Sequence, residues 1–170
     1  MSELPKQYDP KIHEPQAQSL WEEKKIYRPR EESRVFQKET PTFYIPIPPP
    51  NVTGNLHLGH ALTLSIEDIM TRYHRMKGDA TLWVPGTDHA GIATQAQVEK
   101  RLEKNGIHRK ELGREKFLDE CWKWIDEYGG NIQNQIRQMG ATVNWDKERF
   151  TFDTRNNELV EKIFVDLYEK

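Results

Sequence analysis

The first part of this chain alternates between strand-like and helix-like spacing of apolar residues, and this alternation limits the fold more than any other feature. Residues 43–47 and 80–84 are short apolar runs of strand length. Pro46 in the first run indicates an edge, a bulge or the end of that strand. Helical patterns follow each run, over 58–76 and 92–105. The order strand–helix–strand–helix predicts an α/β fold with a parallel, doubly wound sheet that binds its ligand at the carboxyl ends of the strands.

Two glycines are expected to end these helices. Gly78 and Gly106 each follow the last residue of a helical pattern, where a glycine commonly adopts the left-handed conformation that stops a helix. The apolar residues of the first helix step by three and four, forming a stripe: Leu58, Leu62, Ile66, Ile69, Tyr73 and Met76.

A short helix is predicted before the first strand. It covers 14–26 and stops before Pro29, and 28–40 is polar and expected to be a loop. The residues expected to face inward are Leu20, Trp21 and Ile26. We therefore divide the chain into an N-terminal helix and loop, 1–40, and the main α/β part, 41–170.

A long helix is predicted over 114–140, because the three-and-four step persists through that region. Gly129 and Gly130 interrupt the pattern, so we expect a kink there. Core packing is expected of Cys121, Trp122, Trp124 and Tyr128.

The last part of the chain shows two more elements. Residues 145–152 alternate like a short strand or hairpin arm, and 157–170 form an amphipathic helical pattern. The apolar face of that pattern consists of Leu159, Val160, Ile163, Phe164 and Leu167. It stops while still amphipathic, which leads us to expect a chain cut inside a larger protein.

The segment before the first long helix places two histidines three residues apart around a glycine, behind three prolines. Consecutive prolines fix φ and remove donors, so they present carbonyl oxygens on a stiff track. A glycine-containing turn before a helix lets backbone N–H groups and the positive helix end approach a polyphosphate. His57 and His60 can then donate hydrogen bonds to oxygens whose charge grows during phosphoryl-group displacement. These features predict a nucleotide site.

Two other interpretations fit the same histidines. They can be ordinary polar residues at a helix N-terminus, or they can join His74 and His89 around a metal ion. A metal site needs further ligands, and carboxylates that orient the imidazoles, at fitting spacing, so we expect no metal.

Composition excludes several classes of protein. The formal net charge is −2, from 25 basic and 27 acidic residues, so there is no global basic signal for nucleic acid. One cysteine excludes an intramolecular disulfide and suits a reducing compartment. The sequence has no apolar run of membrane-spanning length and no signal-peptide core at its start. We therefore expect a cytoplasmic protein without membrane contact.

Three blocks of the sequence resemble known enzymes. The run 48–62 is similar to the first signature of class I aminoacyl-tRNA synthetases, with HLGH at the position of the H-I-G-H motif. The block 82–95 and the later segments 112–117 and 122–130 are similar to valyl-tRNA synthetases, in the same order. Isoleucyl enzymes usually carry W-D-C-H-G at the second block and leucyl enzymes P-Y-P-S-G at the first, and neither motif occurs here.

This resemblance implies the first half of a class I Rossmann-type fold with a set of site residues. Matching positions imply an amino-acid pocket that includes Pro48, Pro49, Asn51 and Asp88, with Asp88 as the anionic partner of the substrate ammonium. The positions implied to face ATP are Thr53, Gly54, His57, Gly59, His60 and His89. Without the resemblance, Asp88 is equally well an ordinary turn aspartate, and the proline run a rigid connector.

The implied reaction is the attack of the valine carboxylate on the α-phosphorus of ATP, which gives valyl-adenylate and pyrophosphate. Positioning and charge stabilisation suffice, without a protein nucleophile. The family uses Mg²⁺ with the nucleotide and transfers the valyl group to tRNA(Val).

The resemblance is incomplete, because the second family signature, K-M-S-K-S, does not occur in this sequence. We therefore expect one half of an active site, completed by the remainder of a synthetase chain, and an isolated chain that is inactive or very weak. Three alternatives stay open: a free-standing module that binds ATP or an aminoacyl-adenylate without catalysis, a different H-x-G-H nucleotidyltransferase, and a purely structural fragment. The nucleotidyltransferase leaves the block 87–95 unexplained.

Overall fold

The computed structural model describes residues 7–29 and 40–170 of the chain. Most of the predicted loop 28–40 therefore lies outside the described residues, and the domain boundary at residue 40 stays a prediction. The elements, in chain order, are α1 (Pro10–Lys24), β1 (Thr42–Pro46), α2 (Leu58–Lys77), β2 (Ala80–Val84), β3 (Gly86–Thr87), α3 (Gly91–Lys104), α4 (Arg109–Leu112), α5 (Arg114–Gln138), the 3₁₀ turn η1 (Trp145–Lys147), β4 (Arg149–Phe150) and α6 (Thr154–Tyr168).

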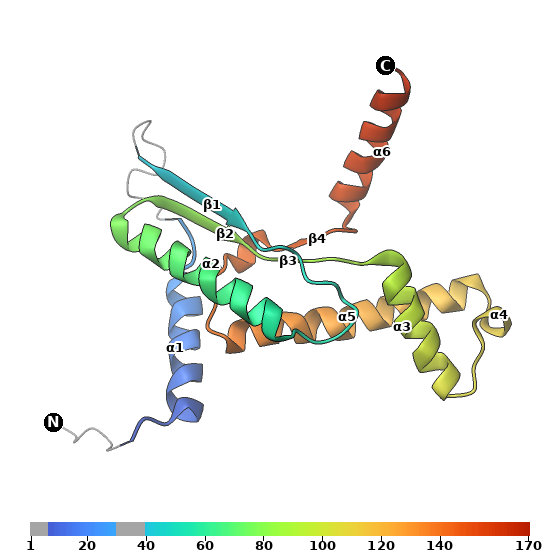
Figure 1. Cartoon of the computed structure of the whole chain (residues 1–170), viewed down its shortest axis with the longest axis horizontal. Helices are drawn as coiled ribbons and strands as arrows, with labels where there is room; N and C mark the ends of the chain where they lie inside the picture. Colours follow the sequence, from blue (N-terminus) through green and yellow to red (C-terminus); the bar gives the residue numbers. More distant parts are fainter. Residues whose placement is uncertain (1–6, 30–39) are drawn as a thin grey trace.

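A parallel strand–helix–strand unit forms the centre of the fold, as predicted. β1 pairs with β2 in parallel, with Thr42 opposite Ala80, and α2 is the crossover between them (Figure 1). Pro46 is the last residue of β1, and Gly78 ends α2 at φ 91°. A second, separate two-stranded sheet follows, in which β3 pairs with β4 in parallel.

The segment 144–151 runs alongside 83–87 and extends this arrangement. The amides of Asn144, Arg149 and Thr151 donate to the carbonyls of Trp83, Pro85 and Thr87, at 2.8 to 3.1 Å. The predicted strand or hairpin arm at 145–152 is therefore a 3₁₀ turn followed by a two-residue parallel strand. This pairing brings residue 151 beside residue 88, although 63 positions separate them in sequence.

Helix α5 joins two separate hydrophobic clusters. Near its C-terminal end, Ile132 and Ile136 pack with Trp83 and Leu64 under the sheet, and near its start Phe117 and Cys121 belong to the cluster formed with α3. The helix runs from Arg114 to Gln138 without interruption, and Figure 1 draws it as one continuous rod. The kink expected at Gly129–Gly130 is therefore wrong, since buried residues on both sides of the glycines hold one helical axis.

Several predicted apolar faces lie in solvent. Leu20 and Ile26 of the α1 region are exposed, and only the neighbouring Trp21 is partly buried. The helix also begins earlier than predicted, because Asp9 caps it and Pro10 occupies its first turn. Trp122 is exposed as well, whereas Trp124 and Cys121 are buried as expected.

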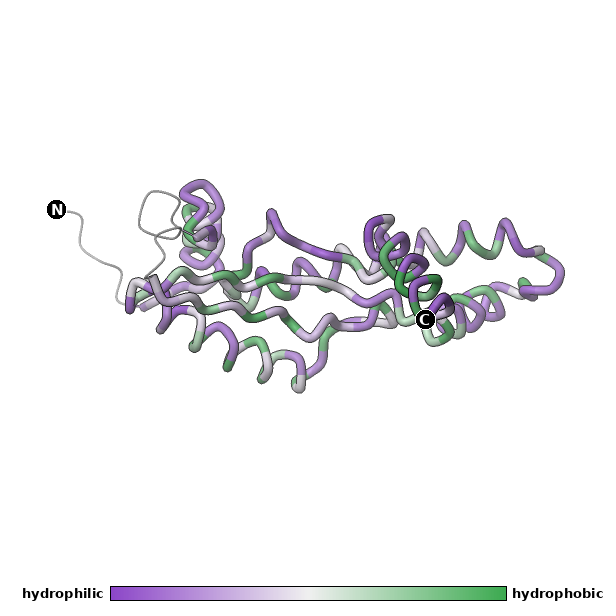
Figure 2. The backbone as a smooth tube through the Cα atoms, turned by 90° about the horizontal axis from the view of Figure 1, so that it is seen from above, coloured by the Kyte–Doolittle hydropathy of each residue, from purple (hydrophilic) through white to green (hydrophobic). Residues whose placement is uncertain are grey.

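The apolar stripe of α2 points away from the sheet. All six of its residues are exposed, and the buried residues of the helix are Leu64, Glu67 and Thr71. Helix α6 has no buried residue, stands apart from the rest of the chain in Figure 1, and carries many hydrophobic residues beside the C label in Figure 2.

Candidate active site

The two histidines of the HLGH segment cap the N-terminus of α2. His57 is the N-cap residue, and its Nδ1 accepts a hydrogen bond from the Gly59 amide at 3.1 Å. In return, Nδ1 of His60 accepts from the His57 amide at 3.1 Å, and the two ring centroids lie 3.8 Å apart. This arrangement is a capping box built from two imidazoles.

Gly59 is required for this cap. A Cβ atom on Gly59 would lie 2.9 Å from Cε1 and 3.0 Å from Nδ1 of His57, which is closer than carbon atoms approach without displacement. The spacing H-x-G-H therefore has a local structural reason, independent of any ligand.

The cap also determines which tautomer each neutral ring adopts. Each Nδ1 accepts from a backbone N–H group, so in the neutral imidazole the proton lies on Nε2. The pKa of His60 is lowered, first by burial and then by the neighbouring His57, which favours the neutral form. Two Nε2–H donors are thereby presented at the positive end of a 20-residue helix, an arrangement suited to an anion.

The proline run and the Asp88 turn lie side by side. The Asp88 amide donates to the Pro50 carbonyl at 2.8 Å, and the Val52 amide donates to the Asp88 carbonyl at 2.9 Å. Asn51 and Asp88 form an isolated parallel bridge between the two segments. The structure thus brings together Pro50, Asn51 and Asp88 from segments more than 30 positions apart.

The Asp88 carboxylate also organises its own turn. Its Oδ1 accepts from the Ala90 amide and from the Thr151 hydroxyl, each at 2.9 Å. Ala90 has φ 51°, a conformation that is unusual for a residue with a Cβ, and it is the N-cap residue of α3. Asp88 is therefore a turn aspartate, with a side chain that is still about one-third exposed (35%). The two interpretations offered by the sequence are compatible.

His89 is held by the segment after β4. Its backbone amide and its Nδ1 both lie within hydrogen-bonding distance of Thr151 Oγ1, at 3.0 and 2.7 Å. Its ring stacks on Phe152, with the centroids 5.0 Å apart. Sequence analysis missed Thr151 and Phe152, because the parallel pairing of β3 with β4 leaves no local signal in the chain.

Helix α5 fixes the segment between the prolines and the histidines. Trp124 Nε1 donates to the Val52 carbonyl at 2.7 Å, and Gln135 Oε1 accepts from the Leu56 amide at 2.9 Å. Both contacts were missed by sequence analysis, which assigned Trp124 only to the core.

The remaining predicted site residues make fewer contacts with the rest of the chain. Thr53 and Gly54 lie in the turn between the proline run and the two histidines, and a Cβ on Gly54 would meet no atom within 4 Å. Pro49 is exposed, and Pro48 and Pro50 line a hollow of about 50 Å³ together with His60. Among the described residues, no hydrogen bond or ion pair links the histidine cap directly to Asp88 or His89.

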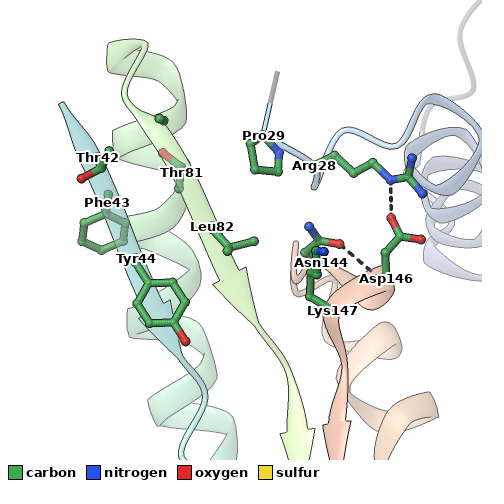
Figure 3. Close-up of a pocket in the computed structure, with 11 residues that line it drawn as sticks. Arg28, Pro29, Thr42, Phe43, Tyr44, Thr81, Leu82, Asn144, Asp146 and Lys147 are labelled. Atoms are coloured by element: carbon green, nitrogen blue, oxygen red, sulfur yellow. Dashed lines mark hydrogen bonds and ion pairs between the residues drawn. The ribbon is translucent and has the colours of Figure 1, made fainter. Parts of the chain in front are cut away.

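Larger hollows lie elsewhere. One of about 600 Å³ lies over a face of the β1–β2 sheet, where Figure 3 shows Tyr44 and Leu82 across from Arg28 and Asp146. It contains none of the predicted site residues. Within residues 7–29 and 40–170, no cluster of three or more His, Cys, Asp or Glu side chains is suited to a metal ion. No helix in that part of the chain is long and apolar enough to cross a bilayer.

The donor set fits a nucleotide better than a bare metal ion. The cap offers N–H donors and no free carboxylate, which suits phosphate oxygens.

Comparison with known proteins gives consistent matches. The family model described as tRNA synthetases class I (I, L, M and V) matches residues 16–170. The chain is 50% identical over 169 residues to the valine–tRNA ligase of Treponema denticola, covering 99% of this chain and 18% of that protein. It is also 50% identical over 167 residues to the mitochondrial valine–tRNA ligase of Sus scrofa, covering 98% of this chain and 16% of that protein.

A solved structure shares the fold. The Agrobacterium radiobacter K84 agnB2 LeuRS, crystallised in a ternary complex with tRNA and LeuAMS, matches with a TM-score of 0.75 at 24% sequence identity. The match covers 96% of this chain and 18% of that chain. The chain thus spans less than a fifth of the length of each of these three proteins.

Proposed function

Because the chain belongs to the class I tRNA synthetases of the isoleucine, leucine, methionine and valine group, we propose that it forms one half of the active site of a valine–tRNA ligase. The whole-chain identity of about 50% to valine–tRNA ligases supports valine as the amino acid. The observation that carries the proposal is the imidazole cap at the N-terminus of α2, which leaves Nε2 of both histidines as donors. The bridge between Asn51 and Asp88, which joins two of the residues proposed for the amino-acid pocket, supports it.

The proposed reaction needs no protein nucleophile. The valine carboxylate attacks the α-phosphorus of ATP, the bond to the β-phosphate oxygen breaks, and pyrophosphate leaves. His57 and His60 donate through Nε2 to the oxygens that gain charge, and the first turn of α2 adds its helix dipole. Asp88 receives the valine ammonium, and Mg²⁺ bound with the nucleotide screens the phosphate charge. Pro48, Pro49, Asn51, Thr53, Gly54 and His89 complete the proposed contacts.

The proposed partners follow from this reaction. Valyl-adenylate is consumed by tRNA(Val), whose terminal ribose hydroxyl accepts the valyl group, and the rest of a synthetase chain would supply the lysines for the β- and γ-phosphates. We place the protein in the cytoplasm, although one relative, from Sus scrofa, is described as mitochondrial.

A hybrid enzyme provides the test. This chain replaces the matching 169-residue segment of the Treponema denticola valine–tRNA ligase, and valine-dependent exchange between pyrophosphate and ATP is measured. We expect activity in the hybrid and a loss of about 100- to 1,000-fold in kcat for His57→Ala and for His60→Ala, the usual effect of removing one transition-state donor. Asp88→Asn should raise KM for valine.

His108→Ala is the matched control, because His108 lies at the start of α4 and makes no side-chain capping bond. A folded hybrid without valine-dependent exchange would contradict the proposal, as would a His57→Ala hybrid as active as its parent.

A binding module without catalysis is the second candidate, because the chain spans only 18% of its Treponema denticola relative. Calorimetry with a non-hydrolysable valyl-adenylate analogue, and with its isoleucyl counterpart, tests it on the chain alone. Binding that prefers the valyl compound and disappears in a His57→Ala/Asp88→Ala variant supports a half-site that forms by itself.

A further inference from the structure

Thr151 occupies a central position in the candidate site. It follows β4, and its amide donates to the Thr87 carbonyl at 3.1 Å, which places its side chain beside the Asp88 turn. Its hydroxyl oxygen lies 2.9 Å from Asp88 Oδ1, 3.0 Å from the His89 amide nitrogen and 2.7 Å from His89 Nδ1.

These three contacts fix the direction of each hydrogen bond. A hydroxyl group has one proton to donate and two lone pairs to accept. The Asp88 carboxylate can only accept, so the hydroxyl proton must point to Asp88 Oδ1. The His89 amide can only donate and occupies one lone pair. The remaining lone pair faces His89 Nδ1, which must therefore carry a proton.

We propose that Thr151 is a positioning residue of the amino-acid site, which holds the Asp88 carboxylate by one oxygen and holds His89 as its Nδ1–H tautomer. The ligand part of this inference rests on the proposed function, whereas the hydrogen-bond part depends only on the geometry of the three residues.

Thr151 leaves one acceptor open on each of its partners. All contacts of the Asp88 side chain with described residues use Oδ1, including the 3.3 Å approach of His89 Nδ1, so Oδ2 is left for the ammonium group of the amino acid. In the neutral His89 ring with Nδ1–H, Nε2 carries no proton and can accept a hydrogen bond from a second donor. This tautomer is the opposite of that in His57 and His60, whose Nε2 atoms donate.

The aromatic packing of the His89 ring does not depend on the Thr151 hydroxyl, so the hydrogen-bonding role of Thr151 can be tested apart from that packing. Its ring stacks on Phe152 and lies edge-on to Phe150, at centroid distances of 5.0 and 6.3 Å. These aromatic contacts do not involve the Thr151 hydroxyl. Replacement of that hydroxyl by a methyl group therefore changes the hydrogen bonds while the ring keeps its neighbours.

The first experiment reads the tautomer directly in the chain itself. Long-range ¹H–¹⁵N correlation spectra distinguish a protonated from an unprotonated ring nitrogen, and His89→Gln identifies the signals of His89. We expect Nδ1–H in the parent chain and in Thr151→Ser. In Thr151→Val we expect a shift toward Nε2–H, the form that a free histidine side chain prefers, because Asp88 Oδ1 at 3.3 Å is a more distant acceptor for Nδ1–H than the Thr151 hydroxyl at 2.7 Å. An Nε2–H tautomer in the parent, or a tautomer population that is the same in Thr151→Val as in the parent, would overturn the inference.

Thr94→Val is the matched control for that experiment. Thr94 also bonds to His89, but through the backbone carbonyl, which its hydroxyl reaches at 2.7 Å. Loss of this bond leaves the ring contacts in place, so the tautomer should stay Nδ1–H. A change of tautomer in Thr94→Val equal to that in Thr151→Val would assign the effect to the loop as a whole, against a specific role of Thr151.

The second experiment measures the consequence for the substrate in the hybrid enzyme. Thr151→Val should raise KM for valine about tenfold, the effect of disturbing a hydrogen bond to a charged group, with a smaller change in kcat. Thr151→Ser should restore the parent KM. Equal losses in the serine and valine variants would overturn the positioning role. An inactive parent hybrid would count against the proposed function alone, because the spectra decide the tautomer without any activity.

Discussion

At the scale of single residues, the HLGH segment owes its geometry to contacts within four positions. The imidazole of His57 lies over Gly59 and accepts from its amide, and His60 accepts from the His57 amide. Such contacts are predictable from sequence, because a cap depends only on nearby residues. Thr151 was not predictable in this way, since its contacts with Asp88 and His89 arise only after β4 has paired with β3.

Gly59→Ala tests the cap. The added methyl group must displace the His57 ring, so the bond to the Gly59 amide is lost at a cost of about 1 kcal/mol, a usual value for a lost helix cap. Alanine in place of glycine within a helix gains up to about 1 kcal/mol, so the unfolding free energy should stay close to that of the parent. Urea unfolding of the isolated chain measures this free energy.

Gly54→Ala is the paired control, because a Cβ there meets no atom within 4 Å. Its unfolding free energy should equal that of the parent, so any loss of exchange activity in the Gly54→Ala hybrid reports on the approach of ATP. A Gly59→Ala chain more stable than the parent by about 1 kcal/mol, the full gain of alanine over glycine in a helix, would show that the imidazole cap contributes nothing.

At the scale of elements, the apolar period located α2 but did not tell which side is buried. The stripe from Leu58 to Met76 is exposed, and the side toward the sheet contains Leu64 together with the polar residues Glu67 and Thr71. The polar residues on this side form hydrogen bonds within the helix or with the neighbouring strand. Trp83 Nε1, from β2, donates to Glu67 Oε2 at 3.1 Å. Sequence periodicity cannot anticipate a buried carboxylate whose partner comes from the next strand.

Glu67→Gln should stabilise the chain at neutral pH. Burial raises the pKa of the Glu67 carboxyl, and the Trp83 hydrogen bond only partly offsets this. The folded state then binds a proton more tightly than the unfolded state, so stability is lost as pH rises through the raised pKa. The loss is about 1.4 kcal/mol for each tenfold difference in proton affinity between the two states. Glutamine keeps an acceptor for Trp83 and carries no charge.

The measurement is thermal or urea unfolding of both chains between pH 4 and pH 7. The variant's advantage should grow with pH across that range. A difference that does not change with pH would mean that Glu67 ionises in the fold as easily as in the unfolded chain.

At the scale of the whole molecule, one helix joins the parts that contain the site. α5 packs under the sheet through Ile132 and Ile136, and against α3 through Phe117 and Cys121. Its glycines predicted a kink, but local propensity was overridden because residues on both sides of Gly129 are anchored in these clusters. The α/β class and the order of α1, β1, α2, β2, α3, α5 and α6 followed from sequence, whereas β3 and α4 were not predicted. The exposure of Leu20, of Ile26 and of helix α6 could not be predicted, since it depends on whether another element packs against each apolar face.

Helix α6 should be the least protected helix of the isolated chain. It has no buried residue, so local opening is opposed by its own backbone hydrogen bonds, the Asp153 cap, a bond from Asn156 to the Phe150 carbonyl and exposed side-chain pairs such as Lys162–Asp166. Hydrogen exchange measured by mass spectrometry should show its amides exchanging on the order of 100-fold faster than those in the middle of α5. The inner face of α2 provides the comparison, because that helix is anchored through Leu64. Protection of α6 equal to that of α5 would show that another surface covers it in solution.

The two hydrogen bonds from α5 to the backbone of residues 52 and 56 have a consequence for the affinity of a ligand bound at the candidate site. Trp124 and Gln135 tie down the connection between the proline run and the histidines before any ligand arrives. Fixing the backbone of one residue costs about 1–2 kcal/mol of conformational entropy. A ligand that meets an ordered connection does not bear that cost at the moment of binding. Side chains that never touch the ligand therefore contribute to its affinity through the entropy already lost when the chain folds.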